Sequence, residues 1–533
     1  MAVSVTIVLT VPLPSSLIAP LFSNLVLLSY LPLDAAFLSA SACYCLILVQ
    51  GKKGACFFGT ILFSILYFMT WNLKIPGGIV GGWDFAIPSQ WSVLQQGGFA
   101  TLVQTGFGPV IFALVGSLTN LFGFVVGLLA FSLARPVVIA GFSFLVAMQL
   151  TSNARIAGLA TVMSIVGDPA FILPGDSIYA SLPNGIIFFL VGTYLLLRFR
   201  SSSAKSEILS AIIVATATLE YPLAAILLVG EALIVQLQAR VSPRLGLELL
   251  ITFSSIFVAW NIFTGSAALL IQQWASEIFQ GIGKTSTSYH SSELLTHLHS
   301  FLGNQPAVLV PFSIGWMLIV FGAGTIVWLY AIIGGRRSTA VFALPMYVVA
   351  IPLLLTQGGY AEYRVFFYLG IFLSVLVLMI LKNRKVTIVG IILMVTLTAL
   401  PTLASTLPQV GFSSSEFPTS YAAGNFLHLS PRPATLFTLS GVMAFDYVYP
   451  SGSVFGQAIY FANGSEYARL VRSFSAGVCG PDSCQFFDIS SIYFASVGYQ
   501  FGSETSSQLR QLLSVQLNSY NLIYSNSVTE IFW

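Results

Sequence analysis

The chain has 533 residues, of which 56% are hydrophobic and only 7% are charged. About a quarter of the residues are charged in a typical soluble domain, so this composition excludes a protein whose whole surface faces water. The 21 basic and 18 acidic residues leave a formal net charge of +3, which is too small to indicate nucleic-acid binding. We therefore expect a membrane protein whose partner is the lipid bilayer and not a nucleic acid.

Long apolar runs recur through residues 1–405, and each is close to the roughly 20 residues that an α-helix needs to cross a bilayer. Together with the charge bias of the breaks between them, they predict about 13 to 15 spans. The first run, from Val3, lacks a preceding basic segment, so we expect a retained span and not a cleaved signal. Residues 1–405 are thus predicted to form a polytopic α-helical membrane domain.

Basic residues gather in short breaks between the apolar runs. These breaks hold Lys52 and Lys53, Arg198 and Arg200, Arg240 and Arg244, Arg336 and Arg337, and Lys382, Arg384 and Lys385. The alternate breaks contain few bases and cover residues 72–104, 167–184, 272–305, 357–364 and everything after 406. Because cytoplasmic loops are enriched in Lys and Arg, the first set predicts the cytoplasmic side and the second the external side. We expect a multi-pass plasma-membrane protein with a cytoplasmic N-terminus.

The stretch from Phe107 to Arg135 fits this alternation only if the chain crosses the membrane there twice or not at all. The condition arises because Asn153 and Arg155 are expected on the cytoplasmic side. A short hairpin that breaks near Asn120 would satisfy it, and so would a helix that lies in the membrane interface. The sequence leaves both arrangements open.

After residue 406 the composition changes, and Ser, Tyr and Gly become more frequent. Three segments alternate β-branched or aromatic residues with small polar ones, as strands do: 453–461, 491–499, and 522 to the C-terminus. A helix is expected at 506–514. We predict that residues 406–533 form an extracytoplasmic β-rich α+β domain, which is long enough to fold as one unit.

The five cysteines fall into two groups. Cys43, Cys45 and Cys56 lie in or beside apolar runs, where cysteine acts as a small apolar residue. Cys479 and Cys484 bracket a short Gly-Pro-Asp-Ser turn in the external tail, where a disulfide can persist, and we predict that they are bonded. The same tail contains one glycosylation sequon, at Asn463.

The predicted external loops carry polar and aromatic side chains suited to a substrate at the membrane surface. They include Trp83, Asp84 and Trp91 in the first loop, Asp168 and Asp176 in the second, and Tyr360, Glu362 and Arg364 in a later one. Such a set suits a substrate that contains a lipid diphosphate and a sugar. The acid would deprotonate or position an acceptor hydroxyl, or hold a metal, while an arginine would neutralise charge that develops on the diphosphate.

Three of the four histidines lie within ten residues, at His290, His297 and His299. On a helix, His290, Glu293 and His297 share one face, and their side chains are of the kinds that ligate a divalent metal. The alternative interpretation is a solvated face of a helix at the membrane interface.

Glu220 and Glu231 stand in or beside an apolar run, eleven residues apart, which corresponds to about three helical turns on one face. Acids at membrane depth are costly and usually face a cavity or a partner. Glu220 precedes Tyr221-Pro222 at a predicted external helix end, where water is available. For Glu231, a structural polar contact and a place in an ion path are both open.

The order of these features resembles the GT-C superfamily of polytopic glycosyltransferases, and more narrowly its prokaryotic arabinofuranosyltransferase-like and oligosaccharyltransferase-like members, from about residue 54 onward. The segments that carry the resemblance are Gly82-Trp83-Asp84, Phe107-Gly-Pro-Val-Ile-Phe, Gln149-Leu-Thr-Ser-Asn-Ala-Arg leading to Gly167-Asp168-Pro169, Glu362-Tyr-Arg-Val-Phe-Phe-Tyr, and Tyr421-Ala-Ala-Gly-Asn-Phe-Leu.

The resemblance implies a membrane glycosyltransferase that moves a sugar from a lipid-phosphate donor to an envelope glycan or glycoprotein on the external face. Asp84 would be the catalytic first-loop acid and Arg364 a phosphate contact, and a divalent metal, Mg or Mn, would be the expected cofactor. Two other functions stay open: a transporter or lipid flippase, which would use Glu231, and a non-catalytic protein that anchors an envelope domain. The chain has no G-x-x-x-x-G-K-[ST] loop, which argues against ATP-driven transport.

Overall fold

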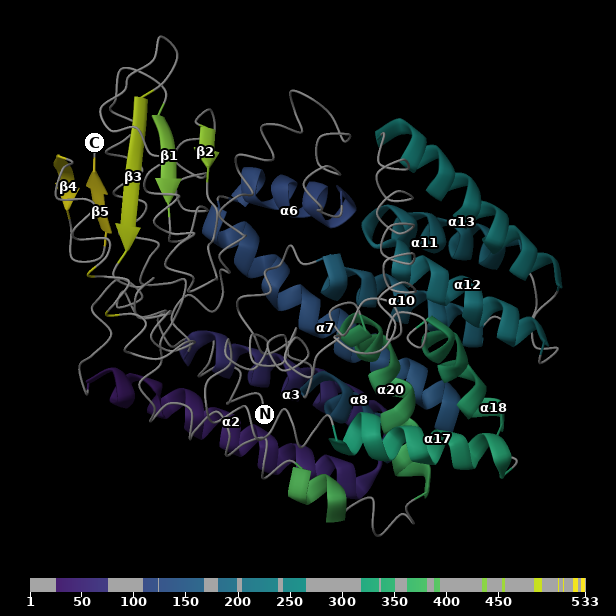
Figure 1. Cartoon of the computed structure of the whole chain (residues 1–533). Coiled ribbons are helices and arrows are strands. Elements are labelled where there is room, and N and C mark those ends of the chain that lie inside the picture. Colours follow the sequence, from purple (N-terminus) through teal and green to yellow (C-terminus); the bar gives the residue numbers. More distant parts are fainter. Residues whose placement is uncertain are drawn as a thin grey trace.

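The computed structural model of the chain (Figure 1) describes the larger part of residues 25–393 and five short strands near the C-terminus. The described ranges are 25–74, 109–122, 124–166, 181–198, 204–237, 243–264, 318–334, 337–349, 362–380, 388–393, 434–438, 453–455, 484–490, 507, 511, 521–525 and 529–532. These ranges are mostly helical, as the sequence predicts.

The helices follow the apolar runs. Their bounds are α2 (Leu25–Gln50), α3 (Lys53–Lys74), α6 (Pro109–Phe122), α7 (Phe124–Thr151), α8 (Ala154–Val166), α10 (Ser181–Arg198), α11 (Ala204–Glu220), α12 (Pro222–Leu237), α13 (Pro243–Thr264), the π-helical η3 (Leu318–Ala323), α17 (Gly324–Ile333), α18 (Arg337–Ala340), the 3-10 turn η4 (Val341–Ala343) and α20 (Glu362–Ile380).

Two tight turns meet at one end of the helical body, which we call the turn end. One joins α2 to α3 through Gly51, which has φ +70°, and the other joins α7 to α8 through Ser152, which has φ 54°. The Arg155 guanidinium donates a hydrogen bond of 2.6 Å to the backbone oxygen of Val49 in the last turn of α2. The breaks at Lys52 and at Asn153 therefore lie together, as expected of two breaks on the same side of a membrane.

From the turn end, α3 and α8 run in the same direction. Thr60 and Tyr44 bond to each other at 2.6 Å, and Gly158 in the second turn of α8 lies against both. The C-termini of α3 and α8 therefore lie at the opposite end of the body, which we call the loop end.

Helices α10, α11 and α12 pack as a layer that runs between the same two ends. At its loop end Gly185 lies against Tyr221, and further along Gly192 lies against Leu228. These contacts make α10 and α12 parallel and α11 antiparallel to both. Helix α20 joins them with its start at the loop end, since Tyr368 reaches Gly185 and Gly370 lies near Ser164 in the last turn of α8.

The helix ends thus alternate between two ends of the body, in agreement with the alternation that the basic clusters predict. The stretch after Phe107 begins as α6, which is 14 residues long and so spans about 21 Å. That is shorter than the roughly 30 Å hydrocarbon core of a bilayer. Helix α6 ends at Phe122 and α7 begins at Phe124, and the hairpin near Asn120 and the interfacial helix both stay predictions.

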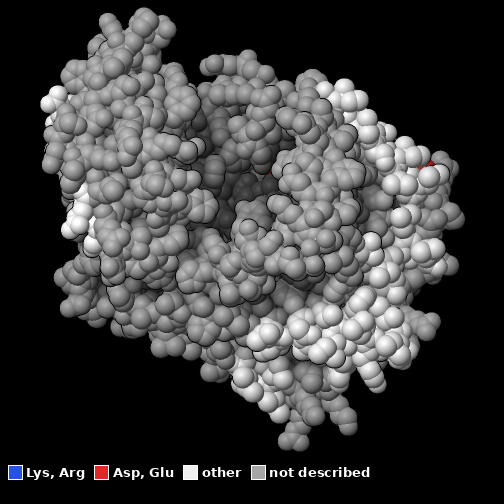
Figure 2. All heavy atoms as spheres, viewed as in Figure 1, with Lys and Arg blue, Asp and Glu red and all other residues white. Residues whose placement is uncertain are grey.

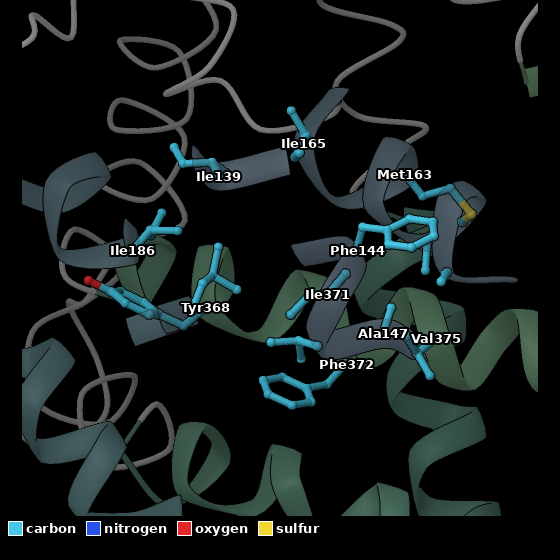
Figure 3. Close-up of a cluster of buried hydrophobic side chains, with 14 of the residues drawn as sticks. Ile139, Phe144, Ala147, Met163, Ile165, Ile186, Tyr368, Ile371, Phe372 and Val375 are labelled. Atoms are coloured by element: carbon cyan, nitrogen blue, oxygen red, sulfur yellow. The ribbon is translucent and has the colours of Figure 1, made fainter. Parts of the chain in front are cut away.

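The core lies where α7, α8, α10 and α20 meet (Figure 3). It contains buried aliphatic and aromatic side chains, among them Ile139, Phe144, Met163, Ile186 and Phe372. Phe189 meets the ring of Tyr368 edge to face, with 5.0 Å between the ring centroids. This packing fixes α20 against the first half of α10, where the loop end is built.

Many large apolar side chains remain exposed on the outside of the helical body. On α13 they form a stripe at helical spacing, with Leu247 57%, Ile251 55%, Val258 53% and Ile262 72% exposed. In Figure 2 the described surface on the side of α11–α13 shows almost no charged colour. Within the described ranges, the stretch Leu133–Thr151 is both long and apolar enough to cross a membrane, while the other apolar helical stretches measure 10–17 residues.

The described strands form one mixed sheet beside the helical body (Figure 1). Its strands are β1 (Ala434–Thr438), β2 (Ser453–Phe455), β3 (Cys484–Ser490), β4 (Leu522–Ser525) and β5 (Thr529–Phe532), in the order β2-β1-β3-β5-β4. β1 is parallel to β2 and β3, and β5 is antiparallel to β3 and β4.

Two of the predicted strand segments occur in this sheet: the first begins as β2, and the C-terminal one forms the β4–β5 hairpin. The sequence did not predict β3, which precedes the predicted segment 491–499. That segment, most of the helix expected at 506–514, and most of residues 406–533 lie outside the described residues, so a β-rich domain of that extent stays a prediction.

Candidate functional site

The loop end is where the segments with the predicted site residues join the described helices. Asp84 and its neighbours Trp83 and Trp91 lie between the end of α3 and the start of α6, while Asp168 and Asp176 lie between α8 and α10. All four of these helix ends belong to the loop end. Tyr360 precedes the start of α20, which lies there too. The fold therefore gathers the boundaries of three predicted external loops at one end of the molecule.

A buried carboxylate, Glu220, holds this end together. Its Oε2 accepts hydrogen bonds from the backbone N–H groups of Val110 and Ile111, at 3.0 and 3.1 Å. Its Oε1 accepts one from Nδ2 of Asn184, at 3.4 Å. The side chain is only 4% exposed. Glu220, the last residue of α11, thus binds the first turn of α6 and the first turn of α10.

The local sequence explains why α6 needs this partner. Pro109 begins the helix, and proline is favoured at the first helical position because it has no N–H to leave unbonded. The following N–H groups have no partner within the helix and carry the positive end of its dipole. A carboxylate satisfies both requirements, so Glu220 caps α6 from another helix, which could not be read from sequence neighbours.

Two sequence interpretations of the glutamates are wrong. Glu220 does not lie in water, because the start of α6 covers it. Glu220 and Glu231 do not share a helical face either, because α11 ends at Glu220 and α12 begins at Pro222. Proline lacks the N–H that a continuous helix needs and disfavours helical backbone in the residue before it, Tyr221.

Beside Glu220, two tyrosines close on the backbone of α10. A Cβ at Gly185 would come within 2.5 Å of the Tyr368 hydroxyl and 2.9 Å of the Tyr221 Cβ, so glycine is the residue that permits this contact. Tyr368 is buried, and its hydroxyl points away from Ile371 and Phe372 (Figure 3). The start of α10 is therefore bound by the Glu220 carboxylate of α11 and packed closely against Tyr221 and Tyr368.

Glu362 and Arg364, two of the predicted substrate-binding residues, lie in the first turn of α20. Position 364 is four residues before Tyr368, and residues at this spacing share a face of an α-helix. Position 364 therefore lies one turn closer to the start of α20 than Tyr368, on the side of the helix that meets Gly185.

Glu231 has a different environment. It is fully buried in the middle of α12, and its Oε2 accepts a hydrogen bond of 2.5 Å from Thr193 Oγ1 of α10. Its other oxygen, Oε1, has no hydrogen-bond partner. Of the two sequence interpretations, the contact with Thr193 supports a structural polar contact between α10 and α12.

The structure adds a third buried charge, which sequence reasoning missed as a site residue. Arg135 of α7 is 5% exposed, and its guanidinium carbon lies 5.9 Å from the ring centroid of Phe68 near the end of α3. The available signal was an arginine inside a long apolar run, directly before Pro136. Charged groups within spans usually mark polar contacts or functional paths.

The remaining predicted site residues lie outside the described residues. They are Trp83, Asp84, Trp91, Asp168, Asp176, His290, Glu293, His297, Tyr360, Asn463 and Cys479. Cys484 begins β3, where it pairs with Ala434. Cys43, Cys45 and Cys56 are free thiols, as expected. In the described ranges no group of three or more metal-ligating side chains occurs.

Comparison with known proteins gives structural neighbours. No protein-family model and no curated protein sequence matches the chain. Among solved structures, the oligosaccharyltransferase of Archaeoglobus fulgidus in complex with Zn and sulfate is 12% identical, with a TM-score of 0.46 over 89% of this chain and 72% of that one.

ArnT of Cupriavidus metallidurans also resembles the chain. Its structure with undecaprenyl phosphate is 12% identical, with a TM-score of 0.38 over 89% of this chain and 97% of that one; its apo structure is 13% identical, with a TM-score of 0.36 over 87% and 95%. The neighbours are thus an oligosaccharyltransferase and ArnT, both at low identity and low TM-score. At these TM-scores we carry no residue role from them to this chain.

Proposed function

We propose that this chain is a membrane glycosyltransferase-like protein that transfers a sugar from a lipid-phosphate donor to an envelope glycan or glycoprotein at the external face. The observation that carries the proposal is the loop end, where the boundaries of the first loop, the second loop and the loop before α20 come together. The first and second loops thus leave and rejoin the described helices at this end, and the loop before α20 joins its helix there too.

Membrane embedding agrees with the outer surface of the helical body. Large apolar side chains such as Phe58, Leu237 and Ile333 are 70%, 85% and 79% exposed. Exposed apolar surface of this extent is unfavourable in water and favourable in lipid. We assign the turn end to the cytoplasmic side because Lys52, Lys53, Arg155 and Arg198 lie there, and the loop end to the external side.

In the proposed reaction, Asp84 is the group that acts on the acceptor. A carboxylate that accepts the proton of an acceptor hydroxyl raises its nucleophilicity toward the sugar carbon. Arg364 contacts the phosphate, where its guanidinium stabilises the negative charge left on the lipid phosphate as the bond to the sugar breaks. Trp83, Trp91, Tyr360, Glu362, Asp168 and Asp176 complete the proposed substrate-binding set.

A divalent metal, Mg or Mn, would bind carboxylates in the external loops. The two buried carboxylates, Glu220 and Glu231, do not fit such a role. Glu220 already accepts three hydrogen bonds from N–H groups, and Glu231 is fully buried beside a single hydroxyl. The metal would therefore depend on Asp84 with Asp168 or Asp176, or on His290, Glu293 and His297, and it would supply positive charge near the phosphate.

The test is a sugar-transfer assay in proteoliposomes with a panel of polyprenyl-phosphate-linked sugars and envelope acceptor glycans. We expect wild-type protein to transfer at least one sugar, and Asp84→Asn to lower kcat by a factor of at least about 100. The matched control is Glu231→Gln, an acid-to-amide change at a buried site away from the loops. Equal rates for wild type and Asp84→Asn would refute the role of Asp84, and no transfer by wild type from any donor would refute the proposed function.

A further inference from the structure

Glu220 connects chain segments that adjoin two different external loops. Val110 and Ile111 lie in the first turn of α6, shortly after the first loop at 72–104, and Asn184 lies in the first turn of α10, at the end of the second loop at 167–184. All three donate hydrogen bonds to the same carboxylate. The position of one side chain therefore sets where both loops rejoin the helical body.

The placement of this acid is unfavourable within its own helix. Glu220 is the last residue of α11, and the C-terminus of a helix carries partial negative charge, which repels a carboxylate. The start of α6 reverses this effect, because its N–H groups and its dipole favour an anion. The charge of Glu220 is therefore favourable at the start of α6 and unfavourable at the end of its own helix, α11. Its stabilising role is a tertiary contact between the two helices.

Burial keeps this carboxylate away from a substrate. Its two oxygens accept three hydrogen bonds, and the side chain is 4% exposed. A group in this state does not reach an acceptor hydroxyl or a lipid phosphate. Glu220 can affect the acceptor and the lipid phosphate only through the positions of α6 and α10, whose first turns it binds.

We propose that Glu220 is a positioning residue: by fixing the start of α6 against α10, it sets the geometry of the first and second loops, and so the distance between Asp84 and the donor. This inference rests on the proposed transferase function. A displacement of about 1 Å at a reacting group is enough to lower turnover by a factor of about 100, so a small shift of α6 would be visible in kcat.

The principal variant is Glu220→Asp, which keeps the charge but retracts it by one carbon, about 1.5 Å. Measured in the same proteoliposome assay, it should lower kcat by a factor of about 10 to 100 while KM for the polyprenyl-phosphate-linked sugar changes less than about threefold. Glu220→Gln keeps the length and loses the charge, and should lower kcat less. Glu231→Gln serves as the matched control and should leave kcat and KM unchanged.

Hydrogen exchange at the start of α6 provides the structural readout. In Glu220→Asp the amides of Val110 and Ile111 should exchange faster than in wild type, while those in the middle of α8 and α20 stay protected. A lower kcat together with uniformly faster exchange in all helices would show global destabilisation and overturn the proposal. Wild-type kcat despite faster exchange at α6 would also overturn it, because α6 would then move without any effect on turnover.

Failure of the proposed function has a separate signature. If wild-type protein transfers no sugar, the probe becomes undecaprenyl phosphate alone, with binding measured by native mass spectrometry. A wild-type Kd that stays within about threefold in Glu220→Asp, together with faster exchange of the Val110 and Ile111 amides in that variant but not in Glu231→Gln, would keep Glu220 as a positioning residue. Unchanged exchange at the start of α6, or no binding by wild type, would reject it.

Discussion

The two ends of the helical body use opposite charges to cap helices across the fold. At the turn end, Arg155 donates to the Val49 carbonyl at the C-terminus of α2; at the loop end, Glu220 accepts from two N–H groups at the N-terminus of α6. Each charge has the sign that the helix dipole favours. The difference is burial: the Arg155 bond is exposed, whereas Glu220 is 4% exposed.

This difference indicates which end depends on its charged residue. Water can replace an exposed donor such as Arg155, but it has poorer access to the part-buried N–H of Val110 and the buried N–H of Ile111 if the carboxylate is removed. Among the described residues of the loop end, three helices, α6, α10 and α11, therefore meet at one buried carboxylate. We expect mutations there to cost more than equivalent mutations at the turn end.

The largest effect is expected for Glu220→Ala. It leaves two backbone N–H groups and the Asn184 amide without their acceptor, and each buried unsatisfied donor costs about 1–3 kcal/mol. We expect a loss of about 3–5 kcal/mol in the free energy of unfolding, measured by titration with SDS in mixed micelles. A loss below about 1 kcal/mol would show that the N–H groups at the start of α6 find another hydrogen-bond acceptor. The loop end would then not depend on its charged residue more than the turn end does.

Gly185→Ala should have the next largest effect. The added methyl would meet the Tyr368 hydroxyl at 2.5 Å and Cβ of Tyr221 at 2.9 Å. Because the Tyr221 Cβ is tied to the backbone and cannot turn aside, we expect a loss of about 1–3 kcal/mol in the same titration. Gly141→Ala is the matched control, since its nearest neighbour would be 3.6 Å away and its cost should be small.

The smallest effect is expected for Arg155→Ala at the turn end. The variant removes one exposed hydrogen bond to Val49, and water can solvate the carbonyl in its place. We expect a loss of less than about 1 kcal/mol in the free energy of unfolding. A loss as large as that of Glu220→Ala would contradict the idea that burial, and not charge alone, distinguishes the two ends.

Sequence reasoning predicted the helical class and the alternation of helix ends, because apolar length and basic clusters are local signals, while it left the arrangement of residues 107–135 open. It failed where a residue's partner is distant in sequence. Glu220 was read from its position before Tyr221-Pro222, yet its partners Val110 and Ile111 are more than a hundred residues away. Arg135 was overlooked because one charge within an apolar run does not reveal Phe68 as its neighbour.

The C-terminal sheet shows the same limit. The terminal hairpin has a turn between two apolar segments, which can be recognised locally. β3 instead pairs with β1, about fifty residues earlier, in parallel, and parallel partners leave no turn signal between them. The roles of Asp84 and Arg364 rest on a resemblance and on loop boundaries, so they need direct tests of chemistry.

We infer that the turn end and the loop end face opposite sides of the membrane, with the loop end outside. The most direct measurement is labelling of single cysteines, Lys53→Cys or Ser89→Cys, in a chain whose native cysteines are replaced by serine, with a membrane-impermeant maleimide on intact cells. We predict that Ser89→Cys is labelled in intact cells and Lys53→Cys only after permeabilisation. Labelling of Lys53→Cys in intact cells, or protection of Ser89→Cys, would contradict the account.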